Sequence, residues 1–284
     1  MAKSTLGSPA HIRAFQKKVL SYYKKNGRHT LPWRKTHDPY KILVSEVMLQ
    51  QTQVERVIPY YNAWIKRWPT AQALAKALLS QLLTAWSGLG YNSRAKRLQE
   101  AVKAIVSLYK GRFPRTRSKI EALPGIGPYT AGAICAFAFN QDVVFIETNI
   151  RTVLFNEFVK VKNDRDHAFV MSDKELLETL EKLLPKGRSR QWYSALMDYG
   201  SYLKSIGKGM NVASKSYKKQ PPLKGSLREI RGAIIRTLTK KPVTQAQLVK
   251  LFSLQRKAEV LEVLLKLQAE GLIQKSGRSY ALPD

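Results

Sequence analysis

The sequence has little cysteine, few acidic residues and no long apolar run. Cys135 is its one cysteine, and a single thiol cannot form an intramolecular disulfide or supply the usual ligands of a structural zinc or iron–sulfur site. Because it lies in the apolar run Ala133–Phe137, we interpret Cys135 as a buried, inert thiol.

The shortage of carboxylates gives the chain a strong positive charge. Its 284 residues include 49 Lys and Arg against 20 Asp and Glu, a formal net charge of +29. This excess predicts a polyanionic partner, with nucleic acid first and an anionic membrane surface second. The sequence contains no apolar stretch of about 18 residues, the length that a membrane-spanning helix needs. Met1–Ser8 lacks the apolar segment of a secretory signal. We expect a cytoplasmic protein, nucleoid-associated if prokaryotic, that acts as a monomer and does not bind membranes.

Apolar residues make up 44% of the chain, enough for packed cores in two compact domains. Residues 1–10 are expected to form a short mobile tail. Helical periodicity continues from residue 11 to 204. The expected helices are His11–Asn26, Tyr40–Trp68, Thr70–Ala77, Leu79–Ser87, Ser93–Tyr109, Ser118–Leu123, Tyr129–Phe139, Asn149–Phe158, Asp173–Leu184 and Arg188–Leu203.

A change of composition near residue 200 indicates that the helical domain ends there and that a linker and a second domain follow. No acidic residue lies between Gly200 and Arg228, so residues 205–225 are interpreted as a basic linker. Residues 226–284 should form another domain. Its expected elements are helices Ser226–Leu238, Thr244–Phe252 and Gln255–Glu270, then a hairpin within Leu272–Leu282. This order is typical of a winged helix, which could contact DNA or another protein.

The segment Leu123-Pro124-Gly125-Ile126-Gly127 lies between two expected helices. Gly125 and Gly127 allow a tight turn that exposes backbone amides, and Pro128 favours the start of the next helix. Unpaired N–H groups at a helix start attract a phosphate oxygen. Gly125, Ile126 and Gly127 are therefore candidate DNA-binding residues, although an ordinary helix–turn–helix corner would have a similar sequence.

At this point the sequence resembles a known family. Leu123–Gly127 is similar to the helix-hairpin-helix of the endonuclease III superfamily, and the carboxylate of Ile146–Val153 follows at the spacing typical of that superfamily. Further segments resemble its adenine DNA glycosylase (MutY-type) branch: Leu31–Arg34, Asp38–Tyr40, Ser45–Val54, Gly88–Tyr91 and Ala195–Gly200. The resemblance covers residues 11–204. It implies a two-lobed, all-helical glycosylase domain. Together with the small winged-helix-like α+β unit expected at residues 226–284, this predicts a mainly α protein.

The resemblance implies a monofunctional DNA glycosylase of base excision repair. Such an enzyme flips mispaired adenine out of double-stranded DNA with a mismatch or damaged base pair and cuts its bond to the sugar. Like glycoside hydrolysis, this reaction needs an acid for the leaving group and an anion facing an oxocarbenium-like sugar. Glu46 matches the family's general acid, and its apolar neighbours would favour the protonated form. On spacing alone, Glu46 would be a surface residue of an amphipathic helix.

Glu147 matches the second family carboxylate, which stabilises the positive charge on the sugar. The family residue there is usually Asp, so the side chain in this sequence is one methylene longer. A misplacement of about 1 Å in such a site can lower a rate by about a hundredfold. Asn149 matches a residue that hydrogen-bonds the carboxylate or the substrate. Glu147 could also cap the helix that begins near Asn149.

Tyr129 stands where strand-cutting relatives carry Lys. A tyrosine cannot form a Schiff base, so we expect release of the base without cleavage of the strand. Tyr129 does not separate adenine glycosylases from thymine mismatch glycosylases.

Other matched positions concern the flipped base and the DNA. Gln51 and Tyr91 match residues that insert into the duplex, where a planar ring can replace lost stacking. Arg94 and Arg97 suit phosphate contacts, or a solvated basic helix face. The expected base pocket consists of Trp33, Arg34, Leu49 and Asp198, with core packing as the alternative for Trp33 and Leu49.

The sequence departs from the family in two places. The four cluster cysteines would fall at Lys204, Asn211, Ser214 and Gln220, and none is Cys. We therefore expect no metal, no iron–sulfur cluster and no other cofactor. The large C-terminal domain that helps the family recognise 8-oxoguanine opposite adenine is also missing, because the 226–284 unit is too short. Two alternatives follow: a thymine or uracil mismatch glycosylase, and a non-catalytic DNA-binding protein with a degenerate glycosylase domain.

Overall fold

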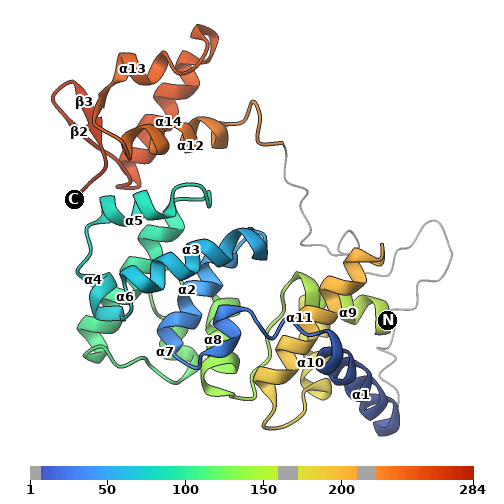
Figure 1. Cartoon of the computed structure of the whole chain (residues 1–284). Coiled ribbons are helices and arrows are strands. Elements are labelled where there is room, and N and C mark those ends of the chain that lie inside the picture. The colour runs from blue at the N-terminus through green and yellow to red at the C-terminus, as the bar shows by residue number, and fades with distance from the viewer. Residues whose placement is uncertain (1–7, 159–171, 210–221) are drawn as a thin grey trace. The chain divides into compact units, whose positions relative to one another are not determined.

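The computed structural model of the chain describes residues 8–158, 172–209 and 222–284, and most of its regular structure is helical (Figure 1). Much of the expected tail and linker therefore lies outside the described residues, together with Asn211, Ser214 and Gln220. Contacts divide the chain into two compact units. Unit 1 comprises residues 1–42, 115–122 and 126–219, and unit 2 comprises residues 43–114, 123–125 and 220–284.

Both units draw on the expected glycosylase segment 11–204. The chain passes from unit 1 to unit 2 inside helix α2 (Pro39–Leu49) and returns to unit 1 for residues 115–122. Within the Leu123–Gly127 hairpin, residues 123–125 belong to unit 2, and unit 1 resumes at residue 126. The expected boundaries at residues 204 and 225 stay predictions.

Unit 1 is built around two buried helices, α8 and α11. Its elements are α1 (Pro9–Asn26), η1 (Pro32–Lys35), α7 (Arg117–Glu121), α8 (Pro128–Phe139), α9 (Thr148–Phe158), α10 (Asp173–Leu183) and α11 (Ser189–Ser205). Helix α11 packs against α1, α8 and α9, and it runs beside α9 in Figure 1. Gly200 permits a close approach of α11 to α9, because a Cβ at this position would lie 2.2 Å from the Asn149 carbonyl oxygen.

Unit 2 contains the rest of α2 and a helical core sealed by tryptophans. Its first helices are α3 (Val54–Arg67), α4 (Ala71–Ala75), α5 (Leu79–Trp86) and α6 (Ser93–Tyr109). Trp64 packs edge-on against Trp68 and Trp86, with ring centroids 4.6 and 5.4 Å apart. Large buried aromatic surfaces of this kind contribute strongly to a core, and here they join α3 to α5.

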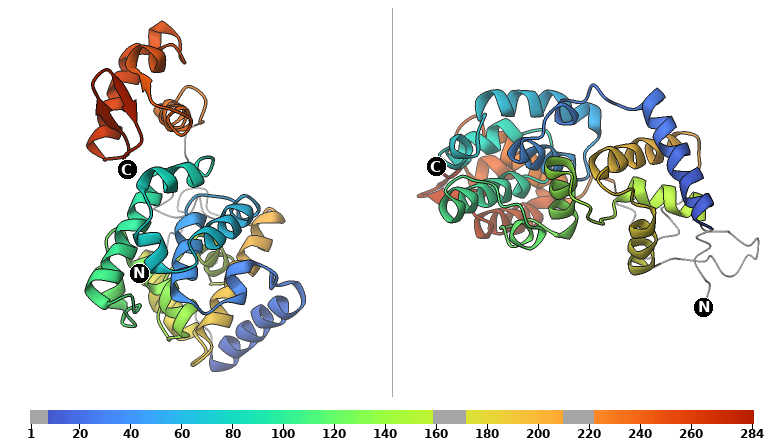
Figure 2. Two further views of the ribbon diagram at one scale, coloured as in Figure 1. Left: turned by 60° about the vertical axis from the view of Figure 1, so that its left-hand side comes forward. Right: turned by 90° about the horizontal axis from the view of Figure 1, so that it is seen from below.

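The C-terminal part of unit 2 has the expected winged-helix order (Figure 2). Its elements are α12 (Leu227–Leu238), β1 (Val243–Thr244), α13 (Gln245–Val249), η3 (Leu254–Arg256), α14 (Lys257–Ala269), β2 (Gln274–Ser276) and β3 (Ser279–Ala281). The hairpin β2–β3 was expected, but β1 was not. Strand β1 pairs antiparallel with β3 and makes a sheet of order β1-β3-β2.

One expected helix is interrupted. Tyr40–Trp68 was predicted as a single helix, but α2 ends at Leu49 and α3 begins at Val54. Gln51 takes a left-handed backbone conformation, with φ of 55°, and no α-helix continues through such a residue. Apolar periodicity on both sides concealed the break.

Across the residues that the structure describes, we find no helix with the length and apolar character needed to cross a bilayer.

Candidate functional site

The proposed acid, Glu46, lies in the unit 2 part of α2. Its side chain is buried, with 5% of the residue exposed. Leu43, about one turn earlier in the same helix, and Val47, the next residue, are buried as well. Glu46 is therefore not the surface residue of an amphipathic helix that spacing alone would favour. A carboxyl that is shielded from water in this way can donate a proton to a reacting group.

The second carboxylate, Glu147, lies in unit 1 at the start of α9. Its Oε1 accepts hydrogen bonds from the backbone N–H groups of Asn149 and Ile150, at 2.8 and 2.9 Å. Its Oε2 accepts from Thr148 Oγ1 at 3.1 Å and from Asn149 Nδ2 at 3.2 Å. The longer side chain thus folds back over the helix N-terminus, whose unpaired amides and partial positive charge stabilise a carboxylate. Glu147 caps α9, and Asn149 bonds to it as expected.

The same asparagine has a partner on α11. Lys204 Nζ donates to Asn149 Oδ1 at 2.7 Å. Burial lowers the pKa of Lys204, and the charge of Glu147 opposes that shift. A contiguous chain of hydrogen bonds therefore runs from Lys204 through Asn149 to Glu147. Sequence reasoning singled out Lys204 only as a missing cysteine.

The expectation that Arg94 contacts phosphate requires correction. Arg94 is 6% exposed, and burial lowers its pKa to about 10. Its guanidinium donates hydrogen bonds inside unit 2 to the carbonyls of Val47, Met48, Gln50, Leu89 and Gly90 and to Thr52 Oγ1, at 2.7–3.2 Å. Arg94 therefore fastens the turn after α2 to the Gly88–Tyr91 turn.

These two turns carry the residues expected to insert into DNA. Gln51 and Tyr91 are both exposed and both have left-handed backbones, with φ of 55° and 47°. Non-glycine residues seldom adopt this conformation, which is found preferentially at functional positions held by the surrounding structure. Arg94 provides that support here, because it binds Gln50 and Gly90, the neighbours of the two strained residues.

The hairpin brings two candidate DNA contacts together in unit 2. Gly125 has φ of +71°, and a Cβ on it would lie 2.8 Å from Cβ of Arg97, so no other residue fits without displacement. Arg97 itself is exposed. On the unit 1 side, Gly127 is the N-cap of α8 with Pro128 at the first position. Ile126 is buried at 7% exposure, so its side chain anchors the turn.

Tyr129 follows the hairpin and is half-buried. Its ring packs edge-on against Phe145, with centroids 5.7 Å apart, and Phe145 stacks on Tyr193 at 4.0 Å. The position that carries Lys in strand-cutting relatives is thus part of an aromatic stack.

Among the expected base-pocket residues, the structure brings Arg34 and Asp198 together. Arg34 Nη2 and Asp198 Oδ1 are 3.2 Å apart, with both side chains almost fully buried. Arg28, which the sequence did not single out, donates its backbone N–H and Nε to the same carboxylate at 2.8 and 2.7 Å. A buried carboxylate needs such partners, so these contacts join η1 to α11. Trp33 is 8% exposed, and Leu49, in unit 2, is half-buried.

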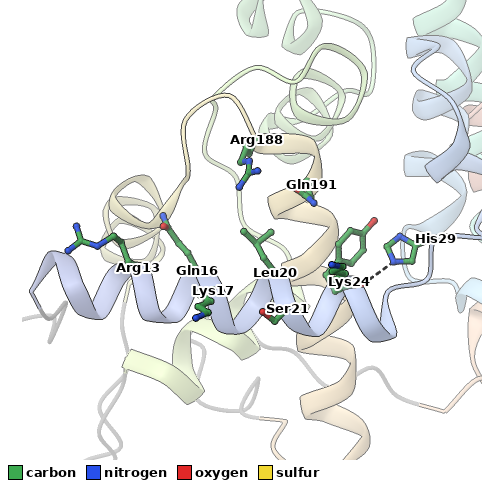
Figure 3. A pocket seen from close by; sticks show the side chains of 10 residues that line it. Arg13, Gln16, Lys17, Leu20, Ser21, Lys24, His29, Arg188 and Gln191 are labelled. Atoms are coloured by element: carbon green, nitrogen blue, oxygen red, sulfur yellow. Dashed lines mark hydrogen bonds between the residues drawn. The ribbon is translucent and has the colours of Figure 1, made fainter.

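An open basic groove of about 760 Å³ lies between α1 and the start of α11 (Figure 3). The side chains of Arg188 and Gln191 lie across it from α1. Its cationic lining consists of Arg13, Lys17, Lys24 and Arg188, with His29 at one end. No carboxylate lines it among the described residues. One ring nitrogen of His29 is hydrogen-bonded to the Tyr23 carbonyl at 2.9 Å. The attraction of the groove for an anion therefore rests on its two arginines and two lysines.

No group of three or more His, Cys, Asp or Glu side chains placed to hold a metal ion is found in the described part of the chain. The thiol of Cys135 is buried, and burial raises its pKa. The interpretation of this residue as a buried thiol is confirmed.

A mainly helical fold with this hairpin, a buried carboxyl at Glu46 and a carboxylate at Glu147 that caps α9 is the combination expected of a DNA base excision protein. Residues 44–186 match the family of HhH-GPD superfamily base excision DNA repair proteins. The adenine DNA glycosylase of Mycolicibacterium smegmatis is 35% identical over 280 residues, which is 91% of this chain and 92% of that one. The chain belongs to the HhH-GPD superfamily and, within it, to the adenine DNA glycosylase family.

Other relatives are longer. The adenine DNA glycosylase of Buchnera aphidicola (subsp. Baizongia pistaciae) is 39% identical over 189 residues, or 66% of this chain. This chain spans about half of that relative, 52% of its length. A solved thermostable thymine-DNA glycosylase is 28% identical with a TM-score of 0.59, over 67% of this chain and 86% of that one. The expected fold class is confirmed.

Proposed function

We propose that this chain removes mispaired adenine, opposite 8-oxoguanine or guanine, from double-stranded DNA by base flipping and acid-assisted cleavage of the N-glycosidic bond. The main support is the buried Glu46 of α2, in a chain whose similarity to an adenine DNA glycosylase extends over nearly its whole length. A buried carboxyl is suited to general acid catalysis on a leaving base.

In this mechanism the side chains have separate tasks. Tyr91 and Gln51 project from their supported turns into the stack that the flipped adenine leaves. Glu46 protonates a ring nitrogen of the adenine, so the base departs neutral. The Glu147 carboxylate stabilises the oxocarbenium-like sugar until water adds to it. Asn149 holds that carboxylate through the bond from Nδ2.

The second candidate substrate is thymine or uracil in a mismatch, because a solved thymine-DNA glycosylase shares the fold at 28% identity. A panel of duplexes with adenine, thymine or uracil opposite each partner base separates the candidates. We expect release of adenine alone. Release of thymine or uracil alone would favour the second candidate, and release of no base would leave DNA binding as the function.

The base should be released without cleavage of the strand, because Tyr129 supplies no amine and its ring is packed against Phe145. Labelled product should stay intact until alkali is added and then break at the abasic site. Strand breaks before alkali, together with an adduct trapped by borohydride, would contradict this expectation and point to an amine elsewhere.

We also propose that the enzyme works without an iron–sulfur cluster. A thiolate cluster needs several cysteines, and the chain has one, which is buried. Lys204, at the first expected cluster position, bonds to Asn149 instead. A monomeric state and a cytoplasmic location stay predictions.

We propose further that the groove between α1 and α11 contacts DNA backbone phosphates. Lys17 and Lys24 are exposed in it, and each phosphate contact contributes about 0.9 to the slope of log affinity against log salt. Replacing both lysines by Gln should therefore flatten the slope by about 2, equally for all sequences. Titration of labelled duplex at several salt concentrations measures the slope.

A matched control is Lys174→Gln with Lys182→Gln, because both lysines are exposed on α10 and lie outside the groove. This pair removes the same charge. Equal flattening by both pairs would mean that net charge, and not the groove, sets the salt dependence.

A further inference from the structure

The lysine at the end of α11 is placed to control the orientation of a side chain at the start of α9. Lys204 Nζ donates to Asn149 Oδ1 at 2.7 Å, and Asn149 Nδ2 donates to Glu147 Oε2 at 3.2 Å. The amide of Asn149 thus has one end on a cation and the other on a carboxylate. Each of the two bonds involves a charged group, the stronger class of hydrogen bond.

An asparagine amide has an acceptor end and a donor end that can exchange places by rotation. An ammonium group can only donate, and an ionised carboxylate can only accept. With Lys204 in place, a rotated amide would set its NH₂ against the ammonium and its oxygen against Glu147, so both bonds would be lost. Lys204 therefore selects the orientation in which Nδ2 faces the carboxylate.

The backbone of α11 supports this contact. Gly200 and Lys204 are four residues apart, so they lie on one face of the helix. At Gly200 the α11 backbone approaches the Asn149 carbonyl, where any Cβ would collide at 2.2 Å. Burial lowers the pKa of Lys204, which is also the effect expected of an amine withdrawn from water. The same face of α11 thus fixes both the backbone and the amide of Asn149.

We propose that Lys204 is a positioning residue for base release, acting on Glu147 through Asn149. The inference rests on the proposed function, because it assigns Glu147 to the sugar. Lys204 donates to the amide, the amide donates to Glu147, and the carboxylate is held in one orientation while the sugar becomes positive. A misplaced carboxylate would stabilise that charge less, so the effect of Lys204 falls on the rate of the chemical step.

The test begins with Lys204→Met, which keeps an apolar stem and removes the donor. Single-turnover release of adenine should fall by about ten- to a hundredfold, the scale of one charged hydrogen bond. Affinity should not change for a duplex with a 2′-fluoro sugar at the target adenine, which resists cleavage. Lys204→Arg, which can still donate to Oδ1, should recover part of the rate. Lys208→Met changes an exposed lysine three residues beyond the end of α11 and should leave rate and affinity unchanged.

A double-mutant cycle separates positioning from general stabilisation. In an Asn149→Ala background, Lys204→Met should change the rate little, because the amide it acts through is gone. Equal losses in both backgrounds would overturn the proposal, as would full activity of Lys204→Met beside an active wild type. If the wild type releases no base from any duplex, the proposed function fails and this inference fails with it.

Discussion

Replacing Glu46 by Gln is expected to lower single-turnover release of adenine by about a hundred- to ten-thousandfold, the usual contribution of a general acid. The amide matches the carboxyl in size but has no proton to transfer to the departing base. Glu46 is buried at 5% exposure inside α2, so a side chain of the same shape should preserve the packing. The rate is measured with enzyme in excess over labelled duplex.

Binding should survive this change. Phosphate contacts supply much of the affinity for DNA, and a buried acidic side chain such as Glu46 cannot neutralise a phosphate. Affinity for the uncleavable 2′-fluoro duplex therefore reports on folding and docking separately from chemistry. Glu55→Gln is the matched control, because Glu55 is an exposed residue in the first turn of α3. Unchanged activity of Glu46→Gln would remove Glu46 from the mechanism, and an equal loss in Glu55→Gln would indicate a nonspecific effect.

Local patterns predicted the elements that short-range chemistry determines. The two glycines of Leu123–Gly127 and the following proline gave the turn and the start of α8, and apolar periodicity gave most helices. The break at Gln51 could not be read this way. Its left-handed backbone is supported by Arg94, more than forty positions further along the chain. A contact at that separation leaves no local signature.

The same limit applies to charged residues. Arg94, which follows Tyr91, was expected to contact phosphate or to lie on a solvated basic helix face, yet its guanidinium donates to buried backbone carbonyls. Arg28 was missed, because only the fold brings it to Asp198. Lys204 was singled out only because it stands where the family has a cysteine. Its bond to Asn149 could not be predicted, because it forms only when α11 packs against α9. Charge patterning indicates a polyanionic partner but does not say which cations reach it.

Replacing Glu147 by Gln is expected to reduce base release by a factor of about a hundred to a thousand, because the charge facing the oxocarbenium-like sugar is lost. The fold should persist. The amide oxygen of Gln can still accept from the backbone N–H groups of Asn149 and Ile150, which Glu147 Oε1 accepts at 2.8 and 2.9 Å. The thermal unfolding temperature reports whether the cap of α9 is kept. The single-turnover rate of base release reports the effect of losing the charge. Thr148→Val, which removes only one donor to Oε2, serves as a mild comparison.

Glu147→Asp separates the cap from the chemistry. Asp is a favoured N-cap residue, so α9 should remain as stable as in the wild type. Its carboxylate would end one methylene nearer the backbone, however, out of reach of Asn149 Nδ2 as that amide is now held by Lys204. Displacement by about 1 Å can lower a rate by about a hundredfold, so we expect Asp to be slower with an unchanged melting temperature. An Asp variant as fast as the wild type, or faster, would mean that the Lys204–Asn149–Glu147 arrangement is not adapted to the longer side chain. In that case the bond from Lys204 to Asn149 would contribute to packing and not to the rate.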